Sequence, residues 1–393
     1  MFGILGVTCM MFLSVSGGPF GLENAMIYTD FMTTICILTW LLFTYMIPLS
    51  IMNYELILKM SLPYNIIGPV EWIYVGLGKT AGIMNSIWDI IDTIIDNAIY
   101  PVLFADNIIA LGCPPEHRYV YGWAMILFVT VFNYFELESA FSILQTFIII
   151  IPFIIAWIIF KPSNMYSEKV LPDIDSIRTS ITIIMWNVNG YDMAAPYANR
   201  VKTPEKTYFI AFFVNTILIY LWNVITYSIG ISIYHSKTDW YDGIFVQMGN
   251  DLSGMWLMVL MGISAAVSSS GTLTAEICST AYLFKGLHEC GVGPSILKNR
   301  KFNILLNGVI LFFSVFLDLE MLIKWSTVLN SFTLFMECYT WGKFLGWNVK
   351  RTVCTLLICI NNILVMSCVD LNCIVFMVVC FGFGLSLAYC HRV

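Results

Sequence analysis

The chain has 393 residues, of which 59% are hydrophobic, 15% aromatic and only 11% charged, and its mean hydropathy is +0.81. Soluble domains carry about 25% charged residues, so this composition excludes a soluble globular protein and predicts one embedded in a lipid bilayer. Its 19 basic and 25 acidic residues give a net charge of −6, which leaves no basic face for nucleic acid.

Apolar runs predict about twelve membrane-spanning helices joined by short loops, since a helix needs roughly 20 apolar residues to cross a bilayer. In chain order they cover residues 2–28, 31–57, 79–111, 119–136, 140–160, 178–199, 205–234, 254–285, 302–317, 320–345, 350–368 and 371–390. The stretch 58–78 is interrupted by prolines and glycines, which weaken a helix. We expect it to be an interfacial connection.

Basic residues gather in alternate loops. With both termini in the cytoplasm, thirteen of the 19 basic residues fall inside and six outside, as the positive-inside rule requires. The loops 161–177 and 235–253 then face outward, and the loop 285–301 faces the cytoplasm. We expect a multi-pass protein of the plasma membrane in this orientation.

Two of the predicted spans are interrupted. The first contains the sequence SGGPFG at residues 16–21, and the sixth contains NVNG at residues 187–190. Unwound backbone at membrane depth survives only where it lines a cavity inside the protein. Paired broken helices in two halves of a chain indicate the substrate site of a secondary transporter.

These breaks predict an all-α fold built from two inverted repeats of five helices. The repeats would cover residues 1–160 and 161–345, and two further helices would follow in residues 346–393. No residue-level repeat is detectable, so the inverted symmetry is inferred from the two breaks alone.

The third span carries an unusual number of acidic residues. Asp89, Asp92 and Asp96 fall at positions i, i+3 and i+7, so they share one helix face, and no lysine or arginine follows Lys79 in this span. An ionisable residue near the bilayer centre costs several kcal/mol and is functional by default. We expect this face to bind a substrate amine or a proton.

Several segments resemble motifs of one transporter family. They are VSGGPFGLENAM (15–26), IDNAIYPVLFAD (95–106), MWNVNGYDMAA (185–195), VKTPEKTY (201–208), AAVSSSGTLTAEICS (265–279) and LNSFTLFMECYTW (329–341). They are similar to motifs of the amino acid–polyamine–organocation superfamily, and specifically of its polyamine uptake and L-type amino acid permease branch. The resemblance runs from about residue 14 to residue 342, and it implies the LeuT-type fold of inverted repeats.

The chain departs from this family at two places. Arg200 stands where the family usually has an acidic residue, and the loop containing Pro-Tyr-Arg that is expected before the eleventh span is absent. Within the matched motifs, Asp96 occupies the aspartate position of the third span, which makes it the first choice among the three acidic residues on that face.

The two breaks supply most of the candidate substrate-binding residues. Exposed N–H groups at the first break suit an amino acid carboxylate, because the positive end of a half-helix points at them. Carbonyl groups freed at the sixth break can accept hydrogen bonds from an ammonium group, and the flanking aromatics can add cation–π contact. The candidates are Ser16, Gly17, Gly18, Pro19, Gly21, Asp96, Trp186, Asn187, Asn189, Gly190 and Tyr191.

Other polar residues inside the spans are candidates for carrying a coupling ion. A buried carboxyl group can carry a proton, whereas serine hydroxyls and freed carbonyls could form an oxygen cage for sodium. We favour the proton. The candidates are Asp96, Asp192, Glu276, Glu337, Ser268 and Ser269. The four histidines fall in predicted loops or tails, so we expect no metal site and no cofactor.

The sequence therefore predicts a secondary active transporter of amino acids or polyamines that works by alternating access with proton coupling. The acidic third span favours a polycation such as putrescine or spermidine, and the glycine-rich break favours an amino acid, so both substrates stay open. Alternatives are an amino acid exchanger and a nutrient-sensing receptor of the same fold that does not transport. No HExxH or GxSxG motif is present, and we do not expect an enzyme.

Overall fold

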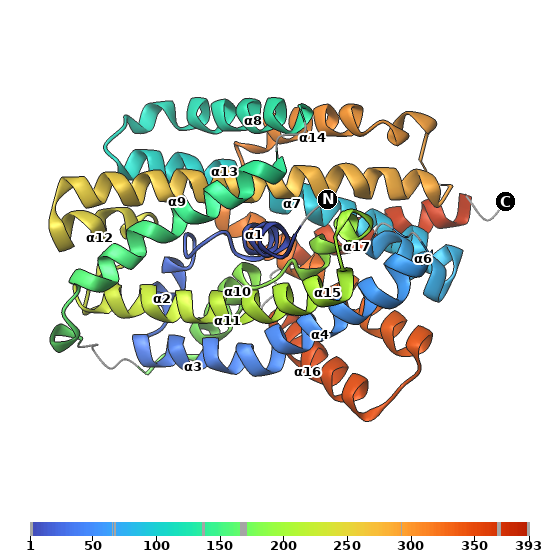
Figure 1. Cartoon of the computed structure of the whole chain (residues 1–393), viewed down its shortest axis with the longest axis horizontal. Coiled ribbons are helices and arrows are strands. Elements are labelled where there is room, and N and C mark those ends of the chain that lie inside the picture. The colour runs from blue at the N-terminus through green and yellow to red at the C-terminus, as the bar shows by residue number, and fades with distance from the viewer. Residues whose placement is uncertain are drawn as a thin grey trace.

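A computed structural model describes residues 3–64, 66, 68–135, 138–165, 171–291, 293–367 and 371–390. These residues fold into helices with no β-strand among them, which confirms the all-α prediction. Figure 1 shows the long helices running along the longest axis of the molecule.

The helices follow the predicted spans closely, and the first span is divided as expected. The α-helices are α1 (Ile4–Val15), α2 (Glu23–Tyr28), α3 (Phe31–Leu41), α4 (Ile47–Leu56), α5 (Leu62–Tyr64), α6 (Pro69–Leu77), α7 (Lys79–Ala110), α8 (Arg118–Tyr134), α9 (Glu138–Ile159), α10 (Ile174–Asn187), α11 (Pro204–Ile231), α12 (Ile244–Ser253), α13 (Met255–Glu289), α14 (Arg300–Ser314), α15 (Leu319–Leu345), α16 (Val349–Met366) and α17 (Leu371–Cys390). Shorter or non-α elements are the π-helical turns η1 (Leu42–Met46) and η2 (Ile57–Ser61) and the 3-10 helices η3 (Pro115–His117), η4 (Pro162–Asn164), η5 (Tyr191–Arg200), η6 (Lys237–Asp239) and η7 (Ser295–Lys298).

Polar caps set where several of these helices begin. The first four N–H groups of a helix have no partner within it, and a side-chain oxygen before the helix satisfies one or two of them. Asp30 and Asn299 each accept from two such groups ahead of α3 and α14, and Asn348 accepts from one ahead of α16.

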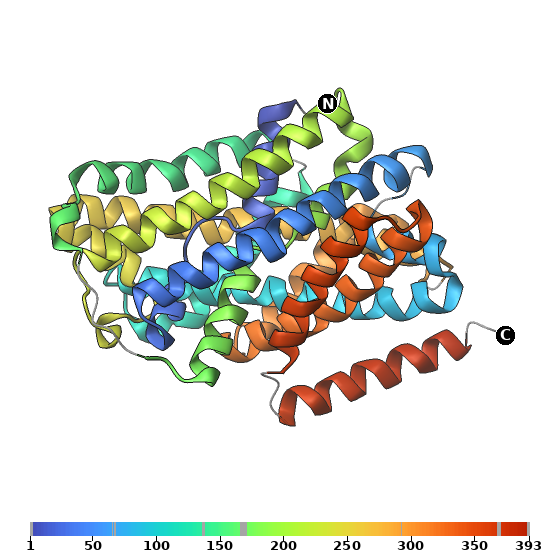
Figure 2. The same cartoon turned by 90° about the horizontal axis from the view of Figure 1, so that it is seen from below.

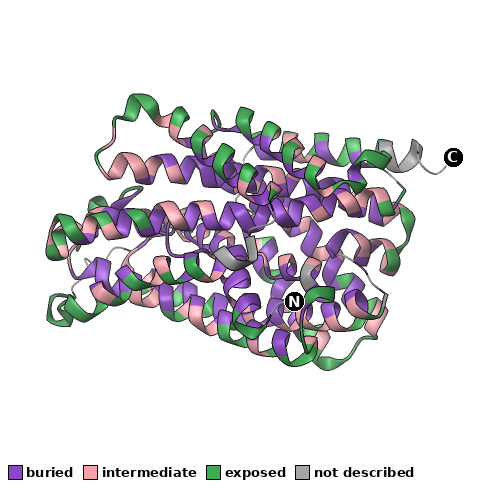
Figure 3. Ribbon diagram, turned by 45° about the horizontal axis from the view of Figure 1, so that its top comes forward, coloured by how far each residue is buried: buried purple, intermediate pink, exposed green. Residues whose placement is uncertain are grey.

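The outer surface is that of an integral membrane protein. Five helices in the described part of the chain are long and apolar enough to cross a membrane, namely Phe31–Ser61, Ser142–Ile159, Pro204–Ile231, Met255–Glu289 and Val349–Met366. Figure 3 shows exposed residues along the outer faces of the helices. They include large apolar side chains such as Leu127, Ile158 and Phe313, and a surface this apolar needs a lipid partner. The total of twelve crossings and the inverted repeats remain predictions.

Two long helices form the centre of the molecule. α7 packs against α13, α15, α8 and α17, and α13 also packs against α9, α12 and α14. Figures 1 and 2 show α8 and α14 side by side along one edge, with α17 lying on the outside of the bundle. The polar residues that α7 and α13 carry therefore face protein.

Some predicted loops are helical. The predicted outer loop 235–253 contains α12, and His288, expected in a loop, lies in the last turn of α13. The stretch 58–78, expected to be an interfacial connection, instead continues the preceding helix through η2 and α5 and then forms α6. His391, residues 166–170 of the predicted outer loop, and residues 368–370 between the last two spans lie outside the described residues.

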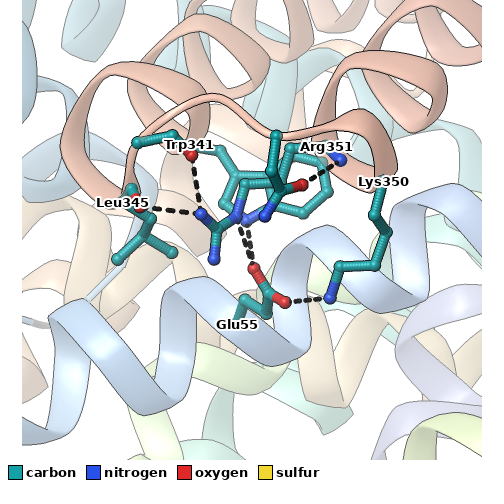
Figure 4. A network of polar contacts seen from close by, with 7 residues as sticks. Glu55, Trp341, Leu345, Lys350 and Arg351 are labelled. Atoms are coloured by element: carbon teal, nitrogen blue, oxygen red, sulfur yellow. Dashed lines mark hydrogen bonds and ion pairs between the residues drawn. The ribbon is translucent and has the colours of Figure 1, made fainter.

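Glu55 on α4 joins three helices (Figure 4). Its Oε2 accepts hydrogen bonds from Arg351 Nε at 2.8 Å and from Trp341 Nε1 at 2.9 Å, and its Oε1 pairs with Lys350. Arg351 also donates to the carbonyl oxygen of Leu345 at 2.7 Å, which satisfies a group at the end of α15. This network fixes the start of α16 against α4 and α15.

Replacing Glu55 with alanine should lower the stability of the folded protein. Arg351 Nε and Trp341 Nε1 would lose their acceptor, and a hydrogen bond to a charged group contributes about 1.5–3 kcal/mol. We expect a clear fall in the unfolding temperature in detergent. Glu320→Ala is the control, because Glu320 is 59% exposed in its pair with Lys324 and such pairs contribute only about 0.3–0.5 kcal/mol. Equal shifts of the unfolding temperature in the two variants would show that the Glu55 network stabilises the protein no more than the exposed pair does.

The predicted orientation is tested by epitope tags in intact cells. A tag in the 285–301 loop should react with antibody only after permeabilisation, because the basic loops are expected to face the cytoplasm. A tag in residues 235–243 should react with antibody in cells that have not been permeabilised. The opposite pattern would reverse the predicted orientation.

Candidate functional site

The two helix breaks contact each other directly. Ser16 Oγ at the end of α1 donates a hydrogen bond to Asn187 Oδ1 at 2.8 Å, and Asn187 Nδ2 at the end of α10 donates to the carbonyl oxygen of Gly18 at 3.2 Å. One side chain of the second break thus satisfies two polar groups of the first. Backbone groups released from a helix in a membrane need such partners, so Asn187 accounts for how the two breaks coexist.

Gly190 allows the second break to approach the first. Its φ angle is +96°, in the region that favours glycine. A Cβ atom at this position would lie 2.6 Å from the carbonyl oxygen of Ser14 on α1. The backbones therefore meet here with no room for a side chain.

A small cavity lies beside the breaks, with an accessible volume of about 50 Å³. Four acidic side chains line it: Asp92 and Asp96 from α7, Asp192 from η5 and Glu276 from α13. Asp92, Asp192 and Glu276 are buried, and Asp96 is partly exposed. No lysine, arginine or histidine is among the described residues that line this cavity. The site is therefore strongly acidic and has no cation of its own.

Asp96 is held by neutral donors. Trp186 Nε1 donates to its Oδ1 at 2.8 Å, and the Tyr100 hydroxyl donates to its Oδ2 at 2.8 Å. Asp92 Oδ1 accepts a hydrogen bond from Ser326 on α15 at 2.8 Å. A carboxylate has about four lone-pair positions, so both groups are oriented and can still accept hydrogen bonds from an ammonium group. Trp186 lies over the site and not toward lipid.

Several predicted residues lie away from the cavity. A Cβ atom on Gly17 would overlap Thr272 Oγ1, and the carbonyl of Gly17 accepts a hydrogen bond from Ser268 Oγ at 2.7 Å. Gly18 faces Ile149 of α9. The first two glycines of the motif therefore permit close packing against α13 and α9, and they are not among the residues that line the cavity.

The remaining residues of the two breaks divide between structural contacts and the cavity wall. The Pro19 carbonyl accepts from the Leu22 N–H in a turn. Tyr191 is buried, stacks on Phe212 and shares a hydrogen bond of 3.2 Å with Thr216, outside the cavity. Asn189 lines the cavity.

The carboxylate of Glu23 occupies the position at the first break where a bound anion was expected. Its Oε2 accepts from the Gly21 N–H at 2.7 Å, its Oε1 accepts from the Gly243 N–H at 3.0 Å, and the residue is only 2% exposed. A carboxylate at a helix N-terminus is stabilised by the helix dipole. The chain's own side chain therefore fills this end of α2. The acidic residue that follows the glycine-rich break in the sequence was a signal that could have predicted this internal partner for the N–H groups.

The coupling-ion candidates have different surroundings. Ser268 donates to Gly17 as above, and Ser269 Oγ donates to the Ala265 carbonyl of its own helix at 3.2 Å. Glu337 on α15 is fully buried, and neither of its carboxylate oxygens has a hydrogen-bond partner. In the described part of the chain no group of three or more His, Cys, Asp or Glu residues is arranged to hold a metal ion.

Tyr45 and Ser326 line the cavity but were missed from the sequence. Tyr45 lies in the π-helical turn η1, and its hydroxyl is 3.4 Å from Asn189 Oδ1. Asn361 on α16 donates to the Thr44 carbonyl at 3.1 Å, which supports this turn. Single π-helical turns are frequent at functional sites, but they have no sequence signature.

A larger cavity of about 340 Å³ lies between α2, α10 and α15. Its acidic lining residues are Asp242, Asp318 and Glu320, and Lys324 pairs with Glu320 at 2.6 Å. Burial raises the pKa of Asp242, and a hydrogen bond from Asn24 opposes this shift.

Sequence comparisons agree with the resemblance. No protein-family profile matches the chain. The chain is 28% identical over 308 residues to a probable polyamine transporter of Arabidopsis thaliana, covering 76% of this chain and 64% of that protein. It is 29% identical over 303 residues to polyamine transporter PUT1 of Oryza sativa subsp. japonica, covering 74% and 56%. It is 27% identical over 314 residues to polyamine transporter RMV1 of Arabidopsis thaliana, covering 76% and 62%.

These matches confirm that the chain resembles the polyamine transporter branch of the superfamily. The chain spans less than two thirds of the length of these curated relatives. All three are named as transporters, which agrees with the expectation of a transport protein rather than an enzyme.

Gly190→Ala should abolish function or folding, because the new Cβ would lie 2.6 Å from a backbone oxygen of α1. The control is Gly112→Ala. Gly112 also has a positive φ, +95°, but no atom lies within 4 Å of the added Cβ, so this variant reports the cost of a side chain at positive φ without the clash, about 1–2 kcal/mol. We expect binding and folding in detergent to survive in the control only. Equal behaviour of the two variants would mean that the close approach of the breaks is unimportant.

Proposed function

We propose that the chain is a secondary transporter of polyamines that works by alternating access with proton coupling. The observation that carries this proposal is the central cavity, which four acidic side chains line and no basic side chain among the described residues neutralises. Buried carboxylates are costly unless they are paired or protonated. A ligand with several positive charges, or protons in its absence, meets this requirement.

The glycine-rich break gives less support to an amino acid substrate. The Gly21 N–H is already bound to Glu23, and Gly17 and Gly18 pack against neighbouring helices. These groups would have to hold the α-carboxylate of an amino acid. The names of the relatives also favour polyamines. Amino acids remain the second candidate because the same cavity can bind an α-ammonium group.

Protons are the better candidate for the coupling ion. Asp96, Asp192 and Glu276 line the cavity, where each can hold a proton when no polyamine is bound. A sodium cage at the first break would draw on the Gly17 carbonyl, which already accepts a hydrogen bond from the Ser268 hydroxyl. The paired breaks of α1–α2 and α10–η5 are the places where the helices can bend as access alternates.

Uptake into proteoliposomes tests this function. Purified protein should accumulate labelled putrescine or spermidine when a pH gradient is imposed, and accumulate little labelled leucine. Uptake of leucine alone would support the amino acid alternative. Accumulation that ignores the pH gradient but needs a counter-substrate would indicate an exchanger, and saturable binding without uptake would indicate a receptor.

Asp96→Asn should weaken polyamine binding by about two to four decades. Removing one partner of a buried charge pair costs roughly 3–5 kcal/mol, and each decade corresponds to 1.4 kcal/mol. Equilibrium binding of labelled spermidine measures the effect, with Asp175→Asn as the control because Asp175 is 86% exposed. A variant that binds normally but no longer responds to the pH gradient would assign Asp96 to proton transfer. Wild-type values for both would remove Asp96 from the mechanism.

A further inference from the structure

Unpartnered polar groups continue beyond the central cavity along α7 and α15. On α7, Asn85 has neither side-chain atom hydrogen-bonded and Asp89 has its Oδ2 without a partner. On α15, Glu337 has both carboxylate oxygens without a partner, and so has the Thr340 hydroxyl. All four residues are at least 96% buried. Buried polar atoms are almost always hydrogen-bonded, so these atoms are open to a partner from outside the chain, either water or a ligand.

The two sets of groups lie on helices that pack against each other. Asn85 and Asp89 are four residues apart and share a face of α7. Ser326 on α15 donates to Asp92, and the ring of Phe332 on α15 contacts that of Trp88 on α7, with centroids 5.7 Å apart. Since residue numbers fall along α7 as they rise along α15, the helices are antiparallel. The Glu337 carboxyl group interacts electrostatically with Asp192 and with Asp89. Asp89 and Glu337 therefore lie on the far side of Asp92 from Asp96.

We infer that Asp89 and Glu337 form a second ammonium subsite, which selects linear triamines over diamines. This inference rests on the proposed function. One terminal ammonium group lies at Asp96, the internal amine lies at Asp92, and the other terminal ammonium group lies between Asp89 and Glu337.

The spacing of the carboxylates matches such a ligand. At 1.5 Å rise per residue, Asp92 and Asp89 lie about 6 Å and about 10.5 Å from Asp96 along the axis of α7. Bonds of about 1.5 Å in an extended chain advance roughly 1.25 Å each, so amines separated by four methylenes are about 6 Å apart and the ends of spermidine about 11 Å apart. A diamine reaches Asp92 only, whereas a triamine reaches Asp89.

A pair of ligands that differ by one terminal amino group tests this subsite. Spermidine and N-propyl-1,4-diaminobutane differ in the terminal amine alone, so the ratio of their affinities reports what recognises that amine. In the wild type we expect spermidine to bind about 10- to 100-fold more tightly, as for hydrogen bonds to charged groups. In Glu337→Gln and Asp89→Asn the ratio should fall to within about threefold, while the affinity of the N-propyl ligand stays nearly unchanged. Asp175→Asn should keep the wild-type ratio.

The ratio of the two affinities does not depend on the amount of folded protein. Glu337→Gln and Asp89→Asn are two independent tests, because each changes a different helix. Both ligands weakened equally in both variants would mean that Asp89 and Glu337 serve structure or proton transfer, which overturns the subsite and leaves the proposed function intact. An unchanged ratio would also overturn it. Wild-type protein that binds neither amine but binds leucine would overturn the proposed function itself.

Discussion

The structure depends on how two interrupted helices satisfy their backbone groups away from water. Inside a membrane each free carbonyl or N–H group needs a partner from the protein, and here a side chain of the second break supplies partners for the first. Asn187 accepts from Ser16 and donates to the Gly18 carbonyl, and Gly190 allows the backbones to touch. α7, α13 and α15 then pack around this junction and bring their acidic side chains to it.

The ligand preference of the site follows from which polar groups at the two breaks already have hydrogen-bond partners within the protein. Glu23 binds N–H groups at the first break and Ser268 binds a carbonyl there, so the break keeps few free groups for an anion or for sodium. The acidic residues of α7 have the opposite character, because Trp186, Tyr100 and Ser326 orient Asp96 and Asp92 without neutralising them. A cavity of this kind is suited to a polycation or to protons, and both use the same carboxylates.

Much of the helical arrangement could be predicted because membrane spans are long and apolar and because glycine and proline mark where they are interrupted. The breaks at 16–21 and 187–190 and the acidic face of α7 were evident in the sequence for this reason. The roles of individual residues within the breaks were less evident. Gly17 and Gly190 look alike in sequence, but one packs against α13 and the other meets α1. Tyr45 reaches the cavity through a π-helical turn that depends on Asn361, more than 300 residues away, and such tertiary contacts leave no local pattern.

The most direct test of the account is an experimental structure of the protein with bound spermidine. The account predicts an extended ligand along α7, with one terminal nitrogen within hydrogen-bonding distance of Asp96 and the internal nitrogen near Asp92. Glu23 should still hold the Gly21 N–H. A ligand bound instead at the first break, with Glu23 displaced from Gly21 and the carboxylates of α7 out of contact, would contradict it.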